Sequence, residues 1–117
     1  MNILIVEDEL LLSLVIEQMI IKLGHRVLDK VASGEEAVEK ALMLKPDLIL
    51  MDVRLAGKID GIEAMEQIST LADIPVVYVS GNTDKASFER AKKTNCLEFL
   101  TKPINISDLD RCFSLAC

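Results

Sequence analysis

The chain has 117 residues, the size of one ordinary domain, and half of them are hydrophobic, which is enough to build a single core. Aromatic residues make up only 3% of the chain, so that core is expected to be aliphatic. The net charge of −6, without a cluster of lysine and arginine, argues against direct nucleic-acid binding, and no apolar run approaches the ~20 residues that cross a bilayer.

The first predicted unit is a strand followed by a helix. Residues 3–6 form a short, continuous apolar run that is typical of a buried strand, and the run ends at an acidic cluster. Residues 9–23 have the composition and length of a helix. Gly24 follows directly, and glycine is a residue type that commonly ends helices.

The second predicted unit has a weaker strand and a clearer helix. Residues 27–32 are a less continuous apolar run. Ser33 is placed to cap a helix over residues 34–44, with Glu36 at the position that a capping box requires. Pro46 lies beyond the end of this helix, where a proline prevents its continuation.

Three further units of strand and helix complete the chain. They pair residues 48–51 with 61–71, residues 76–79 with 84–94, and residues 96–100 with 106–116. Asp84 and Asn105 are suitable N-caps for the last two helices. Alternating units of this kind predict an α/β fold with a parallel sheet, and right-handed crossovers with short loops favour a doubly wound, three-layer sandwich.

Polar side chains stand where the predicted strands end. Glu7 and Asp8 follow the first strand, Asp52 the third, Ser80 the fourth and Lys102 the fifth. Each of these alone is more often a helix cap, a turn residue or a surface lysine. Ligands of such sheets bind at the carboxyl ends of the strands, so the conjunction of all five predicts a functional site there.

The residue types at this edge point to phosphoryl chemistry on a metal. Three carboxylates would repel one another unless a cation lies among them, and Lys102 alone is too little charge to neutralise them. Oxygen-only ligands favour a hard cation, Mg²⁺ or Mn²⁺. A carboxylate beside such an ion can attack phosphorus and form an acyl phosphate, whose oxygens Lys102 and the Ser80 hydroxyl could bind.

With these residues the sequence resembles the receiver domains of two-component response regulators, from Ile3 to the last helix. The matching motifs are I-L-I-V-E-D-E at 3–9, D-L-I-L-M-D at 47–52, D-G-I-E at 60–63, I-P-V-V-Y-V-S at 74–80 and T-K-P-I at 101–104. The resemblance implies one receiver domain over residues 1–117, with a flavodoxin-like (βα)5 fold and strand order 2-1-3-4-5.

The resemblance also implies roles for the acidic residues. Asp52 matches the residue that accepts the phosphoryl group. Glu7 and Asp8 match the acidic pair that holds Mg²⁺ together with Asp52, and Arg54 stands where the family uses a backbone carbonyl as a further metal ligand. No organic cofactor is implied.

Four further positions match the residues with which the family binds phosphate and transmits the signal. Lys102 matches the phosphate-binding lysine, and Pro103 follows it where the family often has a cis peptide. Ser80 matches the switch hydroxyl, and Phe99 occupies the position of the aromatic switch residue.

The function implied by the resemblance is that of a cytoplasmic signalling switch rather than an enzyme, although the switch assists its own phosphorylation and dephosphorylation. A sensor histidine kinase or a histidine phosphotransfer protein would donate the phosphoryl group in a Mg²⁺-dependent reaction. The switch would then act on an output domain or protein. The chain is expected to be a stand-alone regulator or one piece of a larger protein, with no membrane and no direct nucleic-acid partner.

The sequence departs from the commonest family pattern around the expected site. Glu7 replaces an aspartate, Ala56 replaces a frequent proline, and Arg54 places a cation next to the phosphoacceptor. The segment Leu55–Ile59 is one residue longer than usual before Asp60, so the shape of this loop cannot be carried over from the family.

Other features have weaker implications. The helix over residues 9–23 is apolar almost all round, which favours either a partner-binding surface, where the resemblance implies that kinases dock, or a deeper core. His25 is expected to be solvated in a turn. The three cysteines, Cys96, Cys112 and Cys117, are expected to be reduced thiols, because their number is odd and their spacing does not fit a metal site.

Three alternative functions compete with this interpretation. A hydrolase with an aspartate nucleophile would need a second aspartate as general acid, where Asp52-Val53-Arg54 has arginine. A flavin-binding protein would need a phosphate loop after the first strand, and the acidic residues 7–9 would repel a phosphate. A degenerate receiver used only as a scaffold is disfavoured by the retention of all the expected site groups.

Overall fold

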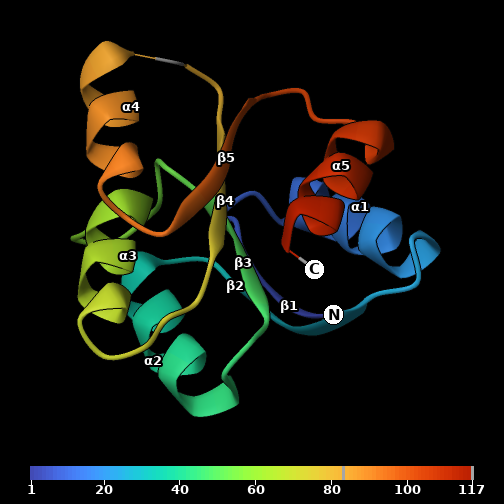
Figure 1. Cartoon of the computed structure of the whole chain (residues 1–117), viewed down its shortest axis with the longest axis horizontal. Helices are drawn as coiled ribbons and strands as arrows, with labels where there is room; N and C mark the ends of the chain where they lie inside the picture. Colours follow the sequence, from blue (N-terminus) through green and yellow to red (C-terminus); the bar gives the residue numbers. More distant parts are fainter. Residues whose placement is uncertain (83, 117) are drawn as a thin grey trace.

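The computed structural model describes residues 1–82 and 84–116, and within them five strands alternate with five helices (Figure 1). The strands are β1 (Asn2–Val6), β2 (Arg26–Val31), β3 (Leu48–Asp52), β4 (Val76–Ser80) and β5 (Cys96–Thr101). The helices are α1 (Leu10–Lys22), α2 (Gly34–Leu44), α3 (Gly61–Ser69), α4 (Lys85–Lys92) and α5 (Ile106–Ala116).

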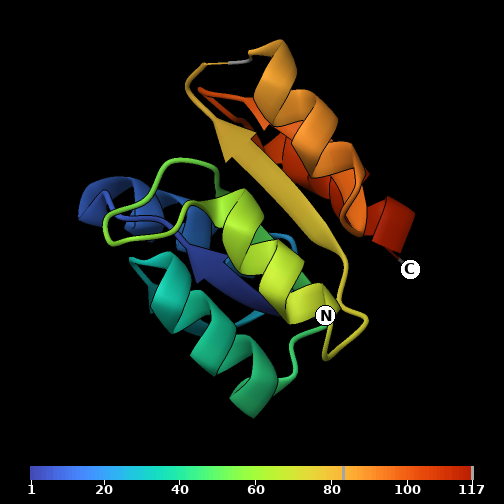
Figure 2. The same cartoon turned by 90° about the vertical axis from the view of Figure 1, so that its left-hand side faces the viewer.

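The five strands form one parallel sheet in the order β2-β1-β3-β4-β5, which confirms the predicted flavodoxin-like topology. Helices α1 and α5 cover one face, and α2, α3 and α4 cover the other (Figures 1 and 2). The strand order reverses between β1 and β3, because the chain crosses to opposite faces after these two strands. Their carboxyl ends therefore border the crevice in which such folds place their ligands.

The continuous apolar runs are explained by a core on each side of the sheet. Along β1, Ile3 and Ile5 pack toward α1 and α5, whereas Leu4 and Val6 pack toward α2 and α3. All four side chains are at most 1% exposed. Burial of one such side chain contributes about 1.5–3 kcal/mol, so strand positions facing either way must be apolar.

Helix α1 ends as the sequence predicts. Gly24 adopts a positive φ of 88°, and its N–H donates to the Ile21 carbonyl at 2.9 Å. The N–H of His25 donates to the Ile20 carbonyl at 3.1 Å. These two bonds form a Schellman motif, for which glycine is the favoured residue.

The predicted capping box of α2 is only half formed, and this expectation was wrong. Ser33 caps the helix by accepting the N–H of Glu36 at 3.2 Å, but the Glu36 carboxylate accepts the Ser33 hydroxyl instead of the Ser33 backbone N–H. A complete capping box lies at the start of α3, between Asp60 and Glu63.

Helices α1, α3 and α4 are shorter than predicted, and α1 loses one residue at each end of the predicted range 9–23. Helices α3 and α4 end two residues before the predicted positions 71 and 94, because their last turns tighten into i→i+3 bonds. Among these are the bonds from the Leu71 N–H to the Ile68 carbonyl and from the Thr94 N–H to the Ala91 carbonyl. Within the described residues, every helix is too short or too polar to span a bilayer.

His25 is half-buried rather than solvated, which corrects the sequence-based expectation. Its ring packs edge-on against Phe113 with centroids 4.9 Å apart, and burial lowers the pKa of His25.

Cys96 and Cys112 are free thiols, as expected, and burial raises the pKa of Cys112 to about 11. Cys117 lies outside the described residues.

Candidate functional site

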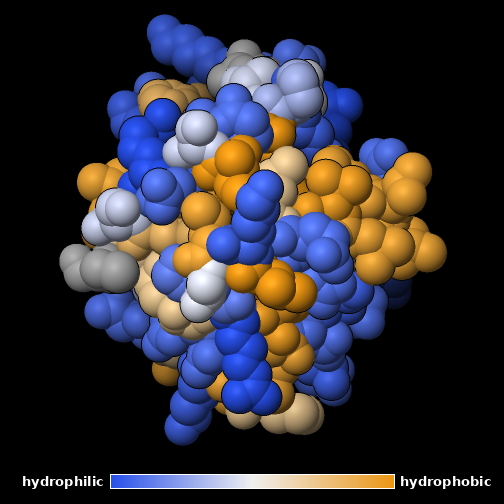
Figure 3. All heavy atoms as spheres, turned by 90° about the vertical axis from the view of Figure 1, so that its right-hand side faces the viewer, coloured by the Kyte–Doolittle hydropathy of each residue, from blue (hydrophilic) through white to orange (hydrophobic). Residues whose placement is uncertain are grey.

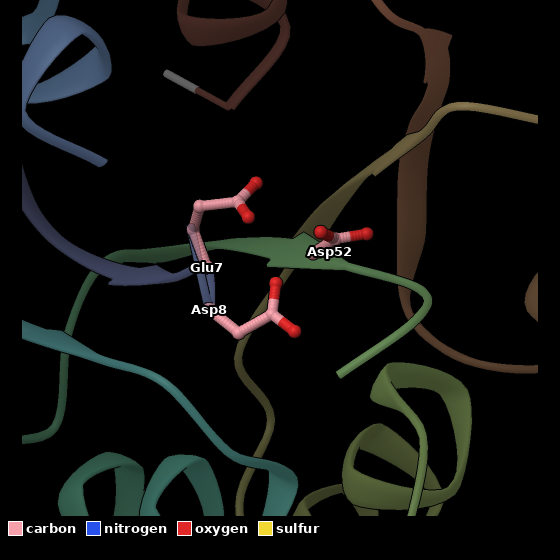
Figure 4. Close-up of side chains that lie close together, drawn as sticks. All are labelled: Glu7, Asp8 and Asp52. Carbon is pink, nitrogen blue, oxygen red and sulfur yellow. The ribbon is translucent and has the colours of Figure 1, made fainter. Parts of the chain in front are cut away.

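The first part of the site is a cluster of three carboxylates from two neighbouring strands. Glu7 and Asp8 directly follow β1, and Asp52 is the last residue of β3. Because Val6 of β1 pairs with Met51 of β3, the residues that follow reach the edge of the sheet at the same level. Figure 4 shows the three side chains around a common point, and one oxygen from each lies within 4.8 Å of the others.

Lys102 brings a positive charge to this cluster from β5, the edge strand that β4 separates from β3. It directly follows β5, and its Nζ lies 3.0 Å from Asp52 Oδ2 and 3.1 Å from Glu7 Oε1. Its backbone N–H donates to the Ser80 carbonyl at 2.8 Å, which fixes the start of the next loop. The peptide bond between Lys102 and Pro103 is cis.

Two of the three negatively charged carboxylates of the site are buried, which is unfavourable for their ionised forms. Glu7 is 5% exposed and Asp52 is 6% exposed. Burial raises the pKa of Glu7, and the nearby Asp52 carboxylate adds to this, although the Glu9 N–H and Lys102 oppose it. For Lys102, burial lowers the pKa, but the hydrogen bonds to Asp52 and Glu7 outweigh burial and leave the pKa raised.

The donor set fits a hard divalent cation. The three carboxylates offer only oxygen atoms, and Lys102 neutralises one of their three charges, which leaves two uncompensated. Mg²⁺ binds such a site through a few carboxylates while it retains waters, and Asp8 is exposed enough to permit this. Glu7, Asp8 and Asp52 are therefore suitable ligands for Mg²⁺ or Mn²⁺.

The backbone after β3 supports the Asp52 side chain. The N–H of Arg54 donates to Asp52 Oδ1 at 3.2 Å, while the Arg54 side chain is exposed. The N–H of Gly61 donates to the Val53 carbonyl at 2.8 Å. A Cβ at position 61 would lie 2.1 Å from the Asp52 carbonyl oxygen, so α3 begins directly against the strand that carries Asp52.

Ser80 and Phe99, the predicted switch residues, have their contacts outside the carboxylate cluster. Ser80 ends β4 and is 2% exposed, and its hydroxyl donates to the Asn82 carbonyl at 2.6 Å. The Phe99 ring lies between Tyr78 and Phe88, with centroid distances of 5.9 and 5.6 Å. The sequence-predicted site therefore divides into a carboxylate–lysine cluster and a separate pair beside α4.

Sequence reasoning missed a contact between the β3–α3 loop and α2. Glu35 of α2 accepts the N–H of Lys58, and Ala56 forms a parallel bridge with Ser33. Gly57 has a positive φ of 99°, and this glycine, with the length of the segment Leu55–Ile59, was a sequence signal of an unusual loop.

Helix α1 presents a large apolar surface. Its exposed apolar residues are Leu10, Leu11, Leu14, Val15 and Ile21, with exposed fractions between 39% and 73%. The face covered by α1 and α5 is shown in Figure 3, where hydrophobic side chains gather in several places. A groove of about 430 Å³ runs between α1 and the segment of residues 104–106. The surplus apolar residues are therefore on the surface and not in a deeper core.

Comparison with known proteins gives a consistent match over nearly the whole chain. A family model described as the response regulator receiver domain matches residues 3–113. The chain is 35% identical over 115 residues to the transcriptional regulatory protein PdtaR of Mycobacterium tuberculosis, an alignment that covers 98% of this chain and 56% of PdtaR. The chain thus spans about half the length of the first curated relatives that it matches.

Two solved structures are similar in both sequence and fold. The signal receiver domain of a modulated diguanylate cyclase from Desulfovibrio desulfuricans has a TM-score of 0.91 and 34% identity, covering 98% of this chain and 91% of that one. The receiver domain of a sensor histidine kinase from Pseudomonas aeruginosa has a TM-score of 0.86 and 32% identity, covering 98% and 96%. That second structure has a magnesium ion coordinated in its active-site cleft.

Proposed function

This chain belongs to the response regulator receiver domain family, and on that basis we propose that Asp52 accepts a phosphoryl group in a Mg²⁺-dependent reaction. The observation that carries the proposal is the convergence of Glu7, Asp8 and Asp52 with Lys102 at the carboxyl edge of the sheet. The donor is the phosphohistidine of a cytoplasmic sensor kinase or phosphotransfer protein. An unidentified output domain or protein receives the signal.

The transfer exchanges one bond to phosphorus for another. A carboxylate oxygen of Asp52 attacks the phosphorus of the phosphohistidine, the P–N bond breaks, and the imidazole leaves with the electron pair and takes up a proton. Asp52 is suited to this attack because its two oxygens are oriented by the Arg54 N–H and by Lys102. The product is an acyl phosphate at the rim of the sheet.

Glu7, Asp8 and Asp52, with the backbone carbonyl of Arg54, would hold the Mg²⁺ ion. When bound, the ion offsets the negative charge that gathers as the phosphoryl group meets the carboxylates. Lys102 is 24% exposed in its side chain, so its ammonium can turn from the carboxylates to a phosphoryl oxygen. Lys102 would then contact the transferred group as a protein cation.

The switch that follows would use Ser80 and Phe99. The Ser80 hydroxyl now donates to the Asn82 carbonyl, and a phosphoryl oxygen is a stronger, charged acceptor for the same proton. If the hydroxyl turns inward, Phe99 can move into the space beside β4 and leave its contacts with Phe88 of α4. Phosphorylation would thereby bias two existing states of the surface around α4 and β5.

The exposed apolar surface of α1 is suited to binding the phosphodonor protein. This surface begins at Leu10, two residues after Asp8, so a protein bound there would stand beside the phosphoacceptor site. Apolar patches bordered by polar residues are typical of protein–protein interfaces. We place the kinase or phosphotransfer protein on this surface.

A scaffold role without phosphorylation is the main competing proposal. It would leave the two uncompensated charges of the carboxylate cluster without a purpose. A hydrolase or a flavin-binding protein fits less well, because the Arg54 side chain cannot serve as an acid and the carboxylates occupy the place of a phosphate.

The proposal is tested by incubating the protein with acetyl phosphate and following its intact mass, with Mg²⁺ and with a chelator. The parent protein should gain one phosphoryl group only with Mg²⁺. Asp52→Asn should gain none and Asp8→Asn much less, whereas Asp110→Asn, an exposed carboxylate on α5, should behave like the parent. Undiminished labelling of Asp52→Asn would refute the assignment.

A further inference from the structure

The loop between β3 and α3 is docked on the beginning of α2. Ala56 of the loop pairs with Ser33 in a parallel bridge, and the Lys58 N–H donates to Glu35 Oε2 at 3.1 Å. Figure 2 shows this loop passing over the start of α2. The loop is thus held by two contacts of its backbone with the beginning of a neighbouring helix.

Two glycines indicate that this contact is closely packed. A Cβ at Gly34 would lie 2.6 Å from Ile59 Cγ1 and 3.0 Å from the Ile59 carbonyl oxygen. Gly57 has a φ of 99°, and a Cβ there would lie 2.7 Å from Glu35 Oε1. At Gly34 an added side chain would meet Ile59, and at Gly57 it would displace the Glu35 carboxylate from the loop.

The loop presents its backbone donors to the Glu35 carboxylate. The Lys58 N–H is the main cause of a lowered pKa at Glu35, followed by the helical N–H of Glu35 itself, with a smaller contribution from the Ile59 N–H. Successive N–H groups that converge on an anion form a nest, and here the anion is a side chain of α2. These N–H groups therefore favour the ionised form of the Glu35 carboxylate, which contacts the loop.

The same loop begins at the proposed cation site. Its first residues place the Arg54 N–H on Asp52 Oδ1, and its end is fixed by the bond from the Gly61 N–H to the Val53 carbonyl. Between these two fixed points, the carboxylate of Glu35 provides a side-chain anchor for the loop. The path of the chain from Arg54 to Gly57 therefore depends on where Glu35 holds the loop.

We propose that Glu35 is a positioning residue for the cation site, because it holds the loop that contains Arg54, whose backbone carbonyl would be a ligand of the ion. This inference rests on the proposed function, in which that carbonyl is a ligand of Mg²⁺. Residues that orient metal ligands commonly change affinity by 10–100-fold when they are removed. Glu35 acts through one backbone carbonyl among several ligands, so an effect of roughly tenfold is expected.

The test is a Mg²⁺ titration of the whole chain, followed by the amide chemical shifts of Asp8 and Asp52. Glu35→Ala should raise the Kd for Mg²⁺ by roughly tenfold, and Glu35→Gln by less, since its amide oxygen can still accept the Lys58 N–H. Glu36→Gln is the matched control, because it removes the same charge from the same helical turn without touching the loop. It should leave the Kd unchanged.

A second readout needs no metal. In Mg²⁺-free solution, Glu35→Ala should accelerate hydrogen exchange at the Lys58 amide and shift the Arg54 amide resonance, while Glu36→Gln should do neither. A parent chain without affinity for Mg²⁺ would overturn both the proposed function and this inference. Unchanged Mg²⁺ affinity in Glu35→Ala, or an equal loss in Glu36→Gln, would overturn the inference alone.

Discussion

At position 54 the backbone belongs to the phosphoacceptor site, whereas the side chain lies in solvent. The backbone N–H of Arg54 orients Asp52, whereas the guanidinium group is exposed and contributes to lowering the pKa of Asp84 after the stronger effect of Ser87. We infer that the exposed guanidinium can reach a phosphoryl group on Asp52, and that changing this side chain leaves the backbone N–H bond to Asp52 in place.

We predict that Arg54→Ala shortens the lifetime of the phosphoryl group and leaves Mg²⁺ affinity nearly intact. An exposed ion pair contributes about 1 kcal/mol at most, which corresponds to a rate change of up to about fivefold. The measurement is the decay of the phosphorylated mass after removal of acetyl phosphate, with Arg54→Lys as the charge-conserving control. Equal lifetimes of the parent and Arg54→Ala would defeat this prediction.

Residue-scale contacts between distant segments were the features that the sequence could not predict. His25 is an example, because its packing on Phe113 depends on how α5 lies against the end of α1. The docking of Glu35 on Lys58 likewise depends on the path of the loop between β3 and α3. Local spacing does not identify the partner residue in either contact.

At the scale of elements, the start of α3 is fixed against β3 by the absence of a side chain at Gly61. A methyl group there would meet the Asp52 carbonyl at 2.1 Å, and backbone cannot give way cheaply. We predict that Gly61→Ala lowers the free energy of unfolding by about 2–3 kcal/mol, since overpacking is destabilising. It should also weaken phosphorylation, because Asp52 would be displaced.

Gly81 provides the matched control for this prediction. A Cβ at position 81 would meet nothing within 4 Å, and its backbone does not have a positive φ. Gly81→Ala should therefore leave the free energy of unfolding within about 0.5 kcal/mol of the parent. Chemical denaturation measures both variants, and similar stabilities would show that α3 can move away from β3 without cost.

Element boundaries were predictable where one residue sets them and not where packing does. Gly24, Asp84 and Asn105 end or cap their helices as predicted, through local bonds that the sequence encodes. The pairing of Arg90 in α4 with Asp60 at the start of α3, at 3.1 Å, was not predicted. To predict this ion pair, one must know which helices are neighbours and which of their faces are in contact.

At the scale of the whole molecule, the topology and the meeting of the acidic residues were predictable, because parallel strands must bring their carboxyl ends to one edge. Glu7, Asp8, Asp52 and Lys102 meet there as expected. The orientation of the Ser80 hydroxyl toward Asn82 was not predictable, since a rotating hydroxyl takes whichever acceptor its neighbours leave free.

We predict that Ser80→Ala permits phosphorylation of Asp52 but uncouples it from the surface around α4 and β5. The hydroxyl is the group that would respond to the phosphoryl oxygen, and Phe99 moves only if the hydroxyl does. The measurement compares amide shifts of residues 84–105 with and without phosphorylation, with the exposed Ser107→Ala as control. Identical responses in the parent and Ser80→Ala would show that Ser80 does not transmit the signal.

The central claim is that the phosphoryl group is on Asp52, and direct mapping tests it best. After treatment with acetyl phosphate and Mg²⁺, borohydride reduces an acyl phosphate of aspartate to homoserine, which peptide mass spectrometry locates. We predict homoserine at position 52 alone and none when Mg²⁺ is chelated. Homoserine at another position, or none at any position in the presence of Mg²⁺, would contradict the proposed function.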